Sequence, residues 1–149
     1  TTVYDVPAKE LIDEIAKKFE KDTTIEIPEA NVYSKTGLNR ESPPSNRNWW
    51  YVRCASILRK IYISNVIGAE HLREEYGGKQ NRGSKPHRAK AGSGTIARRA
   101  VQQLEKAGYV SRIKGKGRRL TPKGRSFLDN TSKEVMDNIK DYYPGLEKY

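Results

Sequence analysis

Cysteine, histidine and methionine are scarce in this chain of 149 residues. It holds one cysteine (Cys54), two histidines (His71 and His87) and one methionine. A lone cysteine excludes an internal disulfide, and these three residues are too few for the ligands of a structural zinc site. We therefore expect a protein of a reducing compartment, with no metal and no cofactor.

Long hydrophobic runs are also missing. Only 35% of the residues are hydrophobic, and the mean hydropathy is −0.88. No stretch approaches the roughly 18 consecutive apolar residues of a membrane span, and the first residues lack the basic-then-apolar pattern of a signal peptide. We expect neither an integral membrane protein nor a secreted one, but a single domain over residues 1–149 with a thin core.

The motifs of common enzyme classes are absent as well. The sequence has no Walker loop, no GxGxxG segment after a strand and no paired carboxylates in an apolar setting. His71, beside Glu70, is interpreted as a surface or half-buried structural residue, and Cys54 as a small core residue. We expect no catalytic residues and no enzyme.

Positive charge is in excess, and the excess is localised. The net charge is +11, yet residues 79–125 contain 15 basic residues and a single acid, Glu105. Residues 1–78 carry a net charge of −1 and residues 126–149 a net charge of −2. A basic block without acids is typical of a protein that binds a phosphate backbone. A membrane surface, the alternative, would favour cations on one amphipathic helix, whereas these are spread over a loop, a helix and a turn.

Two helices are predicted in the first half of the chain. Asp5 and Pro7 favour a helix start, and apolar residues at helical spacing extend the helix over 6–20. Residues 22–48 are predicted to be irregular. Residues 47–64 place their apolar side chains on an arc of about 160°, which predicts a central helix with neighbours on nearly half its surface. The rest of that helix presents three cations and no acid: Arg53, Arg59 and Lys60.

The second half of the chain predicts a short helix, a loop and then a helix with a hairpin. The short helix covers 67–76, ends at Gly77-Gly78 and is followed by a flexible basic loop over 79–94. The next helix covers 95–107, is capped by Ser93 or Thr95 and ends at Gly108. The remaining elements are strands over 109–113 and 118–121 around a turn at 114–117, a last helix capped by Thr121, and a frayed tail over 141–149.

The fold class is therefore mainly α: a helical bundle around a central amphipathic helix, with a winged-helix core that has one β-hairpin as its wing. Winged helices bind DNA, RNA or only protein. A helix-turn-helix DNA reader joins its helices by a tight turn, whereas a basic loop of about 18 residues separates them here. Such a loop favours RNA, which is recognised by shape and backbone. A winged-helix transcription regulator that binds DNA, and an adaptor for an acidic protein, are the alternatives.

The sequence resembles a known family over nearly its whole length. The segment NWWYVRCASILR (48–59) is similar to the signature helix of the small-subunit ribosomal protein called nineteen-e, of archaea and eukaryotes. Shorter matches before and after it, in the same order, are VP (6–7), KTG (35–37), PP (43–44), YGG (76–78), NRGS (81–84), Pro86, IAR (96–98), LE (104–105) and GRRLTPKG (117–124). The pair Trp49-Trp50 and the compact length favour the archaeal branch.

The resemblance implies a ribosomal protein of the head of the small subunit, located in the cytoplasm on the ribosome. It implies contact with small-subunit ribosomal RNA and with neighbouring ribosomal proteins, and a part in maturing the subunit; we expect a monomer when the protein is free. The family's basic positions correspond to Arg53, Arg59, Arg98 and Arg99. The basic block and the central helix add the other RNA-binding candidates: Lys60, Lys79, Arg82, Lys85, His87 (as a stacking residue or phosphate donor), Arg88, Lys90, Arg118, Arg119 and Lys123.

Overall fold

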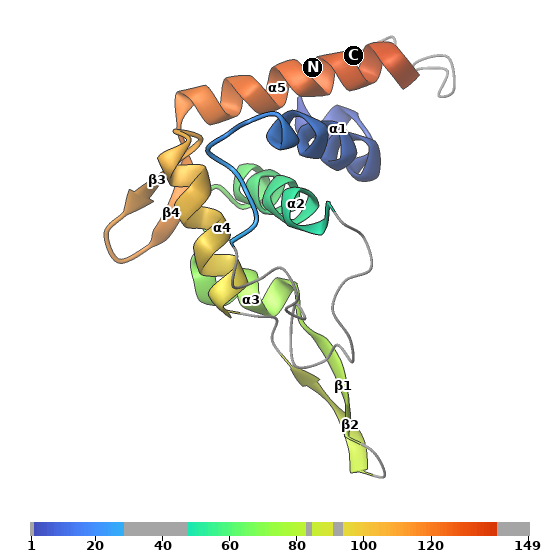
Figure 1. The fold of residues 1–149 in the computed structure, drawn as a ribbon, viewed down its shortest axis with the longest axis vertical. Coiled ribbons are helices and arrows are strands. Elements are labelled where there is room, and N and C mark those ends of the chain that lie inside the picture. The colour runs from blue at the N-terminus through green and yellow to red at the C-terminus, as the bar shows by residue number, and fades with distance from the viewer. Residues whose placement is uncertain (1, 29–47, 83–84, 91–93, 140–149) are drawn as a thin grey trace.

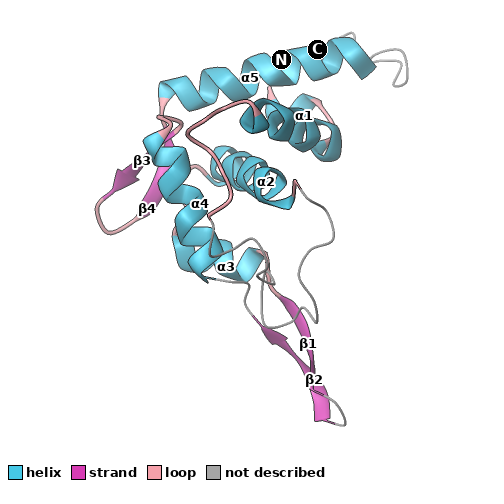
Figure 2. Ribbon diagram, viewed as in Figure 1, coloured by secondary structure: helices cyan, strands magenta, loops and turns pink. Residues whose placement is uncertain are grey.

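The computed structural model describes residues 2–28, 48–82, 85–90 and 94–139, with the backbone alone described over 69–70, 78–82 and 85–90. Its elements, shown in Figure 1, are η1 (Val3–Asp5), α1 (Ala8–Glu20), α2 (Trp49–Ser64), α3 (Ala69–Glu75), β1 (Gly78–Arg82), β2 (Lys85–Lys90), α4 (Gly94–Lys106), β3 (Val110–Ile113), β4 (Gly117–Leu120) and α5 (Pro122–Ile139). The mainly helical class is confirmed (Figure 2). Most of the irregular segment, the candidate cap Ser93 and the tail 141–149 lie outside the described residues.

Helix α2 is the centre of the fold, as its wide apolar arc predicts. Trp50, Cys54, Ile57, Leu58 and Ile61 are fully buried, and the helix packs against α1, α4 and β4. Burying one side chain of this size contributes about 1.5–3 kcal/mol, so this helix supplies much of a small core. A buried polar link accompanies the packing: the indole Nε1 of Trp50 donates to Gln103 of α4 at 3.0 Å.

The first helix starts later than the sequence predicts. Helix α1 begins at Ala8, and its N-cap is Pro7. The carboxylate of Asp5 instead accepts a hydrogen bond from the backbone N–H of Thr2 at 2.8 Å, which closes the 3-10 turn η1. The predicted start at residue 6 is therefore two residues early, because Asp5 takes part in a separate turn before the helix.

The winged-helix core is present as predicted. Gly108 ends α4 with a φ of 90°, the antiparallel strands β3 and β4 form the wing, and Gly115 lies in its turn with a φ of 76°. Thr121 caps α5, because its hydroxyl accepts the backbone N–H of Gly124 at 3.1 Å. The wing is also fixed to the body by Ile67, whose N–H and C=O exchange two hydrogen bonds with the backbone of Arg118.

The basic segment between α3 and α4 is a hairpin and not the structureless loop that the sequence predicts. β1 and β2 pair antiparallel, with Gly78 opposite Lys90, Gln80 opposite Arg88 and an irregularity before Arg82. Figure 1 shows this hairpin extending away from the helices. The pattern missed it because the two strands, GKQNR and KPHRAK, show no alternation of apolar and polar residues. Its mobility in the free protein stays a prediction.

Candidate nucleic-acid interface

Arg53 is held on α2 by an aromatic neighbour. Its guanidinium carbon lies 4.0 Å from the centroid of the Tyr76 ring, within the range of a cation–π contact. The Tyr76 hydroxyl is hydrogen-bonded to Ser56, one turn further along α2. Burial raises the pKa of Tyr76 to about 12, so the ring stays neutral at physiological pH. Arg53 is thus half-buried and oriented by a fixed ring.

Lys60 lies two turns after Arg53 and has an acidic partner. Its ammonium is 3.3 Å from the carboxylate of Glu75 and 5.5 Å from the Tyr76 ring centroid. Glu75 also interacts with His71 at 3.1 Å, and the hydrogen bonds from His71 and Lys60 lower the pKa of Glu75 below its ordinary value. The cationic face of α2 therefore lies beside an acid of α3, which the sequence of α2 alone does not indicate. This exposed ion pair competes with phosphate for Lys60 and is weak enough to be exchanged for it.

Arg59 belongs partly to the interior. The residue is half-buried, and its Nε atom is buried without a hydrogen-bond partner among the described residues. A buried donor without a partner costs about 1–3 kcal/mol. A ligand can reach Arg59 only through its other atoms, because Nε itself is covered.

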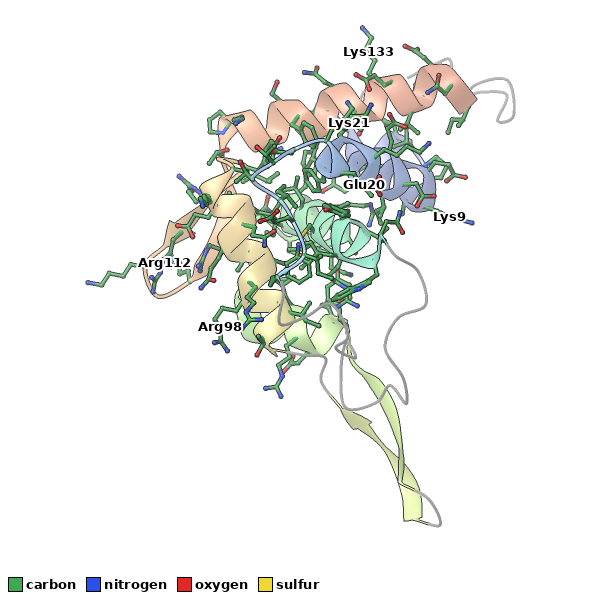
Figure 3. All side chains as sticks on the ribbon, viewed as in Figure 1. Lys9, Glu20, Lys21, Arg98, Arg112 and Lys133 are labelled. Atoms are coloured by element: carbon green, nitrogen blue, oxygen red, sulfur yellow. The ribbon has the colours of Figure 1, made fainter. Side chains whose placement is uncertain are left out.

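Helix α4 contributes a pair of adjacent arginines, Arg98 and Arg99. Its apolar face is buried as predicted, with Ile96, Ala100 and Leu104 fully covered. Arg98 is exposed and Arg99 is half-buried. In Figure 3, Arg98 and Arg112 of the wing point outward on the same side of the molecule. The recognition helix and the wing therefore present cations together.

The hairpin brings the remaining cationic positions onto two paired strands. Lys79 and Arg82 lie on β1, and β2 carries four more of the candidates: Lys85, His87, Arg88 and Lys90. Because the strands pair antiparallel, Arg82 lies opposite Lys85 in the register. No acid occurs in either strand, so the hairpin is a continuous basic element.

The wing candidates differ in how far their side chains are occupied. The Arg118 Nε lies 3.3 Å from a carboxylate oxygen of Glu105, the one acid of the basic block, and Arg118 is half-buried. Lys123 donates to the carbonyl oxygen of Ala107 at 2.9 Å, at the C-terminal end of α4. Arg119 is exposed. Of these three, Arg119 is the one placed to meet a ligand without losing a contact to another described residue.

The family model described as "Ribosomal protein S19e" matches residues 2–138 of the chain. This chain belongs to the S19e family. A "Small ribosomal subunit protein eS19" of Aeropyrum pernix is 46% identical over 147 residues, covering 97% of this chain and 96% of that protein. Proteins of the same name from Thermoplasma acidophilum and Haloarcula marismortui are 43% and 41% identical, each covering 99% of this chain and 98% of its own length. The resemblance found in the sequence is confirmed, including its archaeal side.

Three further cations of this S19e chain were not among the candidates and are exposed on the wing. Arg112 lies on β3, and Lys114 and Lys116 lie in the turn between β3 and β4. The turn was predicted from its glycines, and exposed turn tips with cations are a common backbone-contacting feature. The predicted turn and its cations were therefore enough to add Arg112, Lys114 and Lys116 to the candidates.

Two observations concern metal-ligating and nucleophilic side chains in the described part of this S19e protein. Between residues 2 and 139, outside the gaps, no group of three His, Cys, Asp or Glu side chains is arranged to hold a metal ion. Burial raises the pKa of Cys54, whose thiol is fully enclosed by α2 and its neighbours. A buried protonated thiol is unreactive.

Proposed function

We propose that this protein is a structural component of the small ribosomal subunit, that it binds ribosomal RNA, and that it takes part in the maturation of the subunit. Family membership and the names of the relatives support the first part. The basic block supports the second, because 15 cations against one acid over residues 79–125 is the charge pattern of a backbone-binding surface. The protein then acts by binding, not as an enzyme.

The single observation that carries RNA binding is the fixed placement of cations on packed helices. Arg53 is oriented by Tyr76, and Arg98 projects from a helix whose opposite face is in the core. A side chain on a fixed backbone avoids the cost of about 1–2 kcal/mol per residue that ordering a mobile backbone requires. Its planar fork also meets two phosphate oxygens at once. These helices are therefore the primary contact, and the hairpin adds to it.

The number of phosphate contacts follows from the cations that the fold leaves available. The basic block suggests six to eight contacts, which corresponds to a slope of log K against log salt of about −4 to −7. Arg118 and Lys123 already have internal partners. We expect the measured slope at the shallow end of this range.

We further propose that the protein acts on cytoplasmic ribosomes, beside other proteins of the subunit head, and that it is a monomer when free. Within the described residues, no helix combines the length and the hydropathy needed to cross a bilayer. The segments on either side of the basic block carry net charges of only −1 and −2, and we propose that neighbouring proteins contact them.

A DNA-binding transcription regulator is the second candidate, because α3, α4 and the wing have winged-helix order. A DNA reader lays its recognition helix into the major groove beside a tightly joined partner helix. Here the hairpin β1–β2 is inserted between α3 and α4 and extends away from the body (Figure 1). An inserted arm of this kind favours an irregular RNA surface over a regular duplex.

Co-sedimentation of the native protein with small subunits in low and high salt tests the proposal. We expect it to remain with the subunit at moderate salt and to dissociate as salt rises, in line with phosphate contacts. Random-sequence duplex DNA should compete, but less well than subunit RNA. A DNA sequence bound more than about 10³-fold better than random duplex would support the regulator instead.

A further inference from the structure

A shallow hollow lies where the end of α2, strand β4 and the start of α5 meet. It has a volume of about 440 Å³, which is within the range of small-ligand pockets. Ile61, Val66 and Leu120 supply its apolar part, and Arg119 and Arg125 supply two cations. No acidic side chain lines it.

One exposed apolar side chain belongs to this hollow. In the described ranges, the large hydrophobic residues exposed by more than a third are Tyr4, Ile63 and Val66, and of these Val66 lines the hollow. An apolar wall beside two cations suits a ligand that is part apolar and part anionic.

Arg125 is fixed at the rim of the hollow before any ligand arrives. Its guanidinium carbon lies 4.7 Å from the centroid of the Tyr62 ring. The Tyr62 hydroxyl donates to Asp129 of α5 at 2.9 Å, which holds the ring in place beneath Arg125. α5 begins at Pro122 beside the hollow, and the positive end of its dipole adds to the two arginines.

We propose that this hollow binds one nucleotide of single-stranded RNA, with the base on the apolar side and the phosphate between Arg119 and Arg125. This inference rests on the proposed function and adds a contact site distinct from the α2 and α4 cations. An acidic peptide would satisfy the arginines but would leave the apolar part uncovered. A base and its phosphate use both parts: the base packs on the aliphatic side chains, and the phosphate meets the arginines, as the backbone does in the charged grooves that bind single strands.

The experiment uses the full chain with labelled methyl groups, titrated with a uridine tetranucleotide. We expect saturable shifts of the Ile61, Val66 and Leu120 methyl resonances. Arg119→Gln and Val66→Glu should each weaken this binding about tenfold, since each removes or opposes one charged contact. Lys133→Gln is the matched control, because Lys133 is an exposed cation on α5 away from the hollow (Figure 3), and it should change the affinity less than about twofold.

Two further probes separate the explanations. Pyrophosphate that shifts the same methyl groups with equal affinity would overturn the role of the base. An acidic tetrapeptide that saturates them where the tetranucleotide does not would overturn RNA as the occupant.

The proposed function can fail separately. If the tetranucleotide shifts α4 or the hairpin but not these methyl groups, the hollow is not a site and RNA binding stands. If it shifts no residue and the protein does not co-sediment with small subunits, both proposals fail.

Discussion

Arg53→Ala and Arg98→Ala should have the same effect on RNA binding and different effects on stability. Both residues are on packed helices, but Arg98 is exposed while Arg53 lies over Tyr76 at 4.0 Å. The sequence places Arg53 on the open face of α2, which would predict no stabilising role. The structure changes that expectation, because the side chain covers an aromatic ring.

The magnitude follows from these contacts. A partly desolvated cation–π contact contributes about 1 kcal/mol, so Arg53→Ala should lower the melting temperature by about 2–4 °C in a chain of this size. Arg98→Ala removes an exposed side chain and should change the stability by less than about 0.5 kcal/mol. Each variant loses one charge-assisted phosphate contact, which corresponds to about a tenfold loss of affinity.

The assay pairs thermal unfolding with RNA binding at several salt concentrations, because lost phosphate contacts make the salt slope less negative by about 0.7–0.9 each. Arg53→Lys adds a third measurement: it keeps the charge but not the planar fork, so we expect it to restore the salt slope but only part of the affinity. The reasoning is refuted if Arg98→Ala melts several degrees lower, or if both alanine variants fold normally and bind RNA as the native chain does.

Three further changes test the fold and its electrostatics. Gly124→Ala should lower the free energy of unfolding by about 3 kcal/mol or more in denaturant unfolding, because a Cβ there would collide with the backbone carbonyl of Tyr109. Gly115→Ala, in open space with a φ of 76°, should lower it by only about 1–2 kcal/mol. Equal losses in the two variants would contradict this reasoning. Cys54 should resist a thiol reagent in the folded protein and react on unfolding, and rapid labelling under native conditions would contradict its burial. In an NMR titration Glu75 should show a pKa below the ordinary pKa of a glutamate. Its ion pairs therefore stabilise the fold at pH values above that ordinary pKa, and this stabilisation is lost as the pH falls through the lowered pKa. A measured pKa at or above the ordinary one would contradict the ion pairs.

The helices could be predicted because their evidence is local. In α4, Ile96, Ala97, Ala100, Val101 and Leu104 recur at helical spacing, and all five are buried. The wing could be predicted equally well, since Gly115 and Gly117 mark a turn that requires positive φ. Both signals lie within a few residues of the element that they specify.

The hairpin β1–β2 could not be predicted in the same way. Its strands pair with each other in a separate two-stranded sheet, so no core imposes an apolar face on them. Polar, cationic residues and glycines then favour a loop by composition, although the backbone can still pair. Two-stranded hairpins of this kind are marginally stable alone, which makes the hairpin the segment whose order depends most on a bound partner.

The sequence also does not show which cations of the basic block already have an internal partner and which are exposed to a ligand. Arg118 and Arg119 are adjacent and identical, yet one pairs with Glu105 at 3.3 Å and the other is exposed. The alternation of side chains along β4 sends them to opposite faces, and the position of Glu105 on α4 decides which face is already neutralised. Charge counting therefore identifies the block, while the packing of α4 against the wing determines which of its arginines can reach a phosphate.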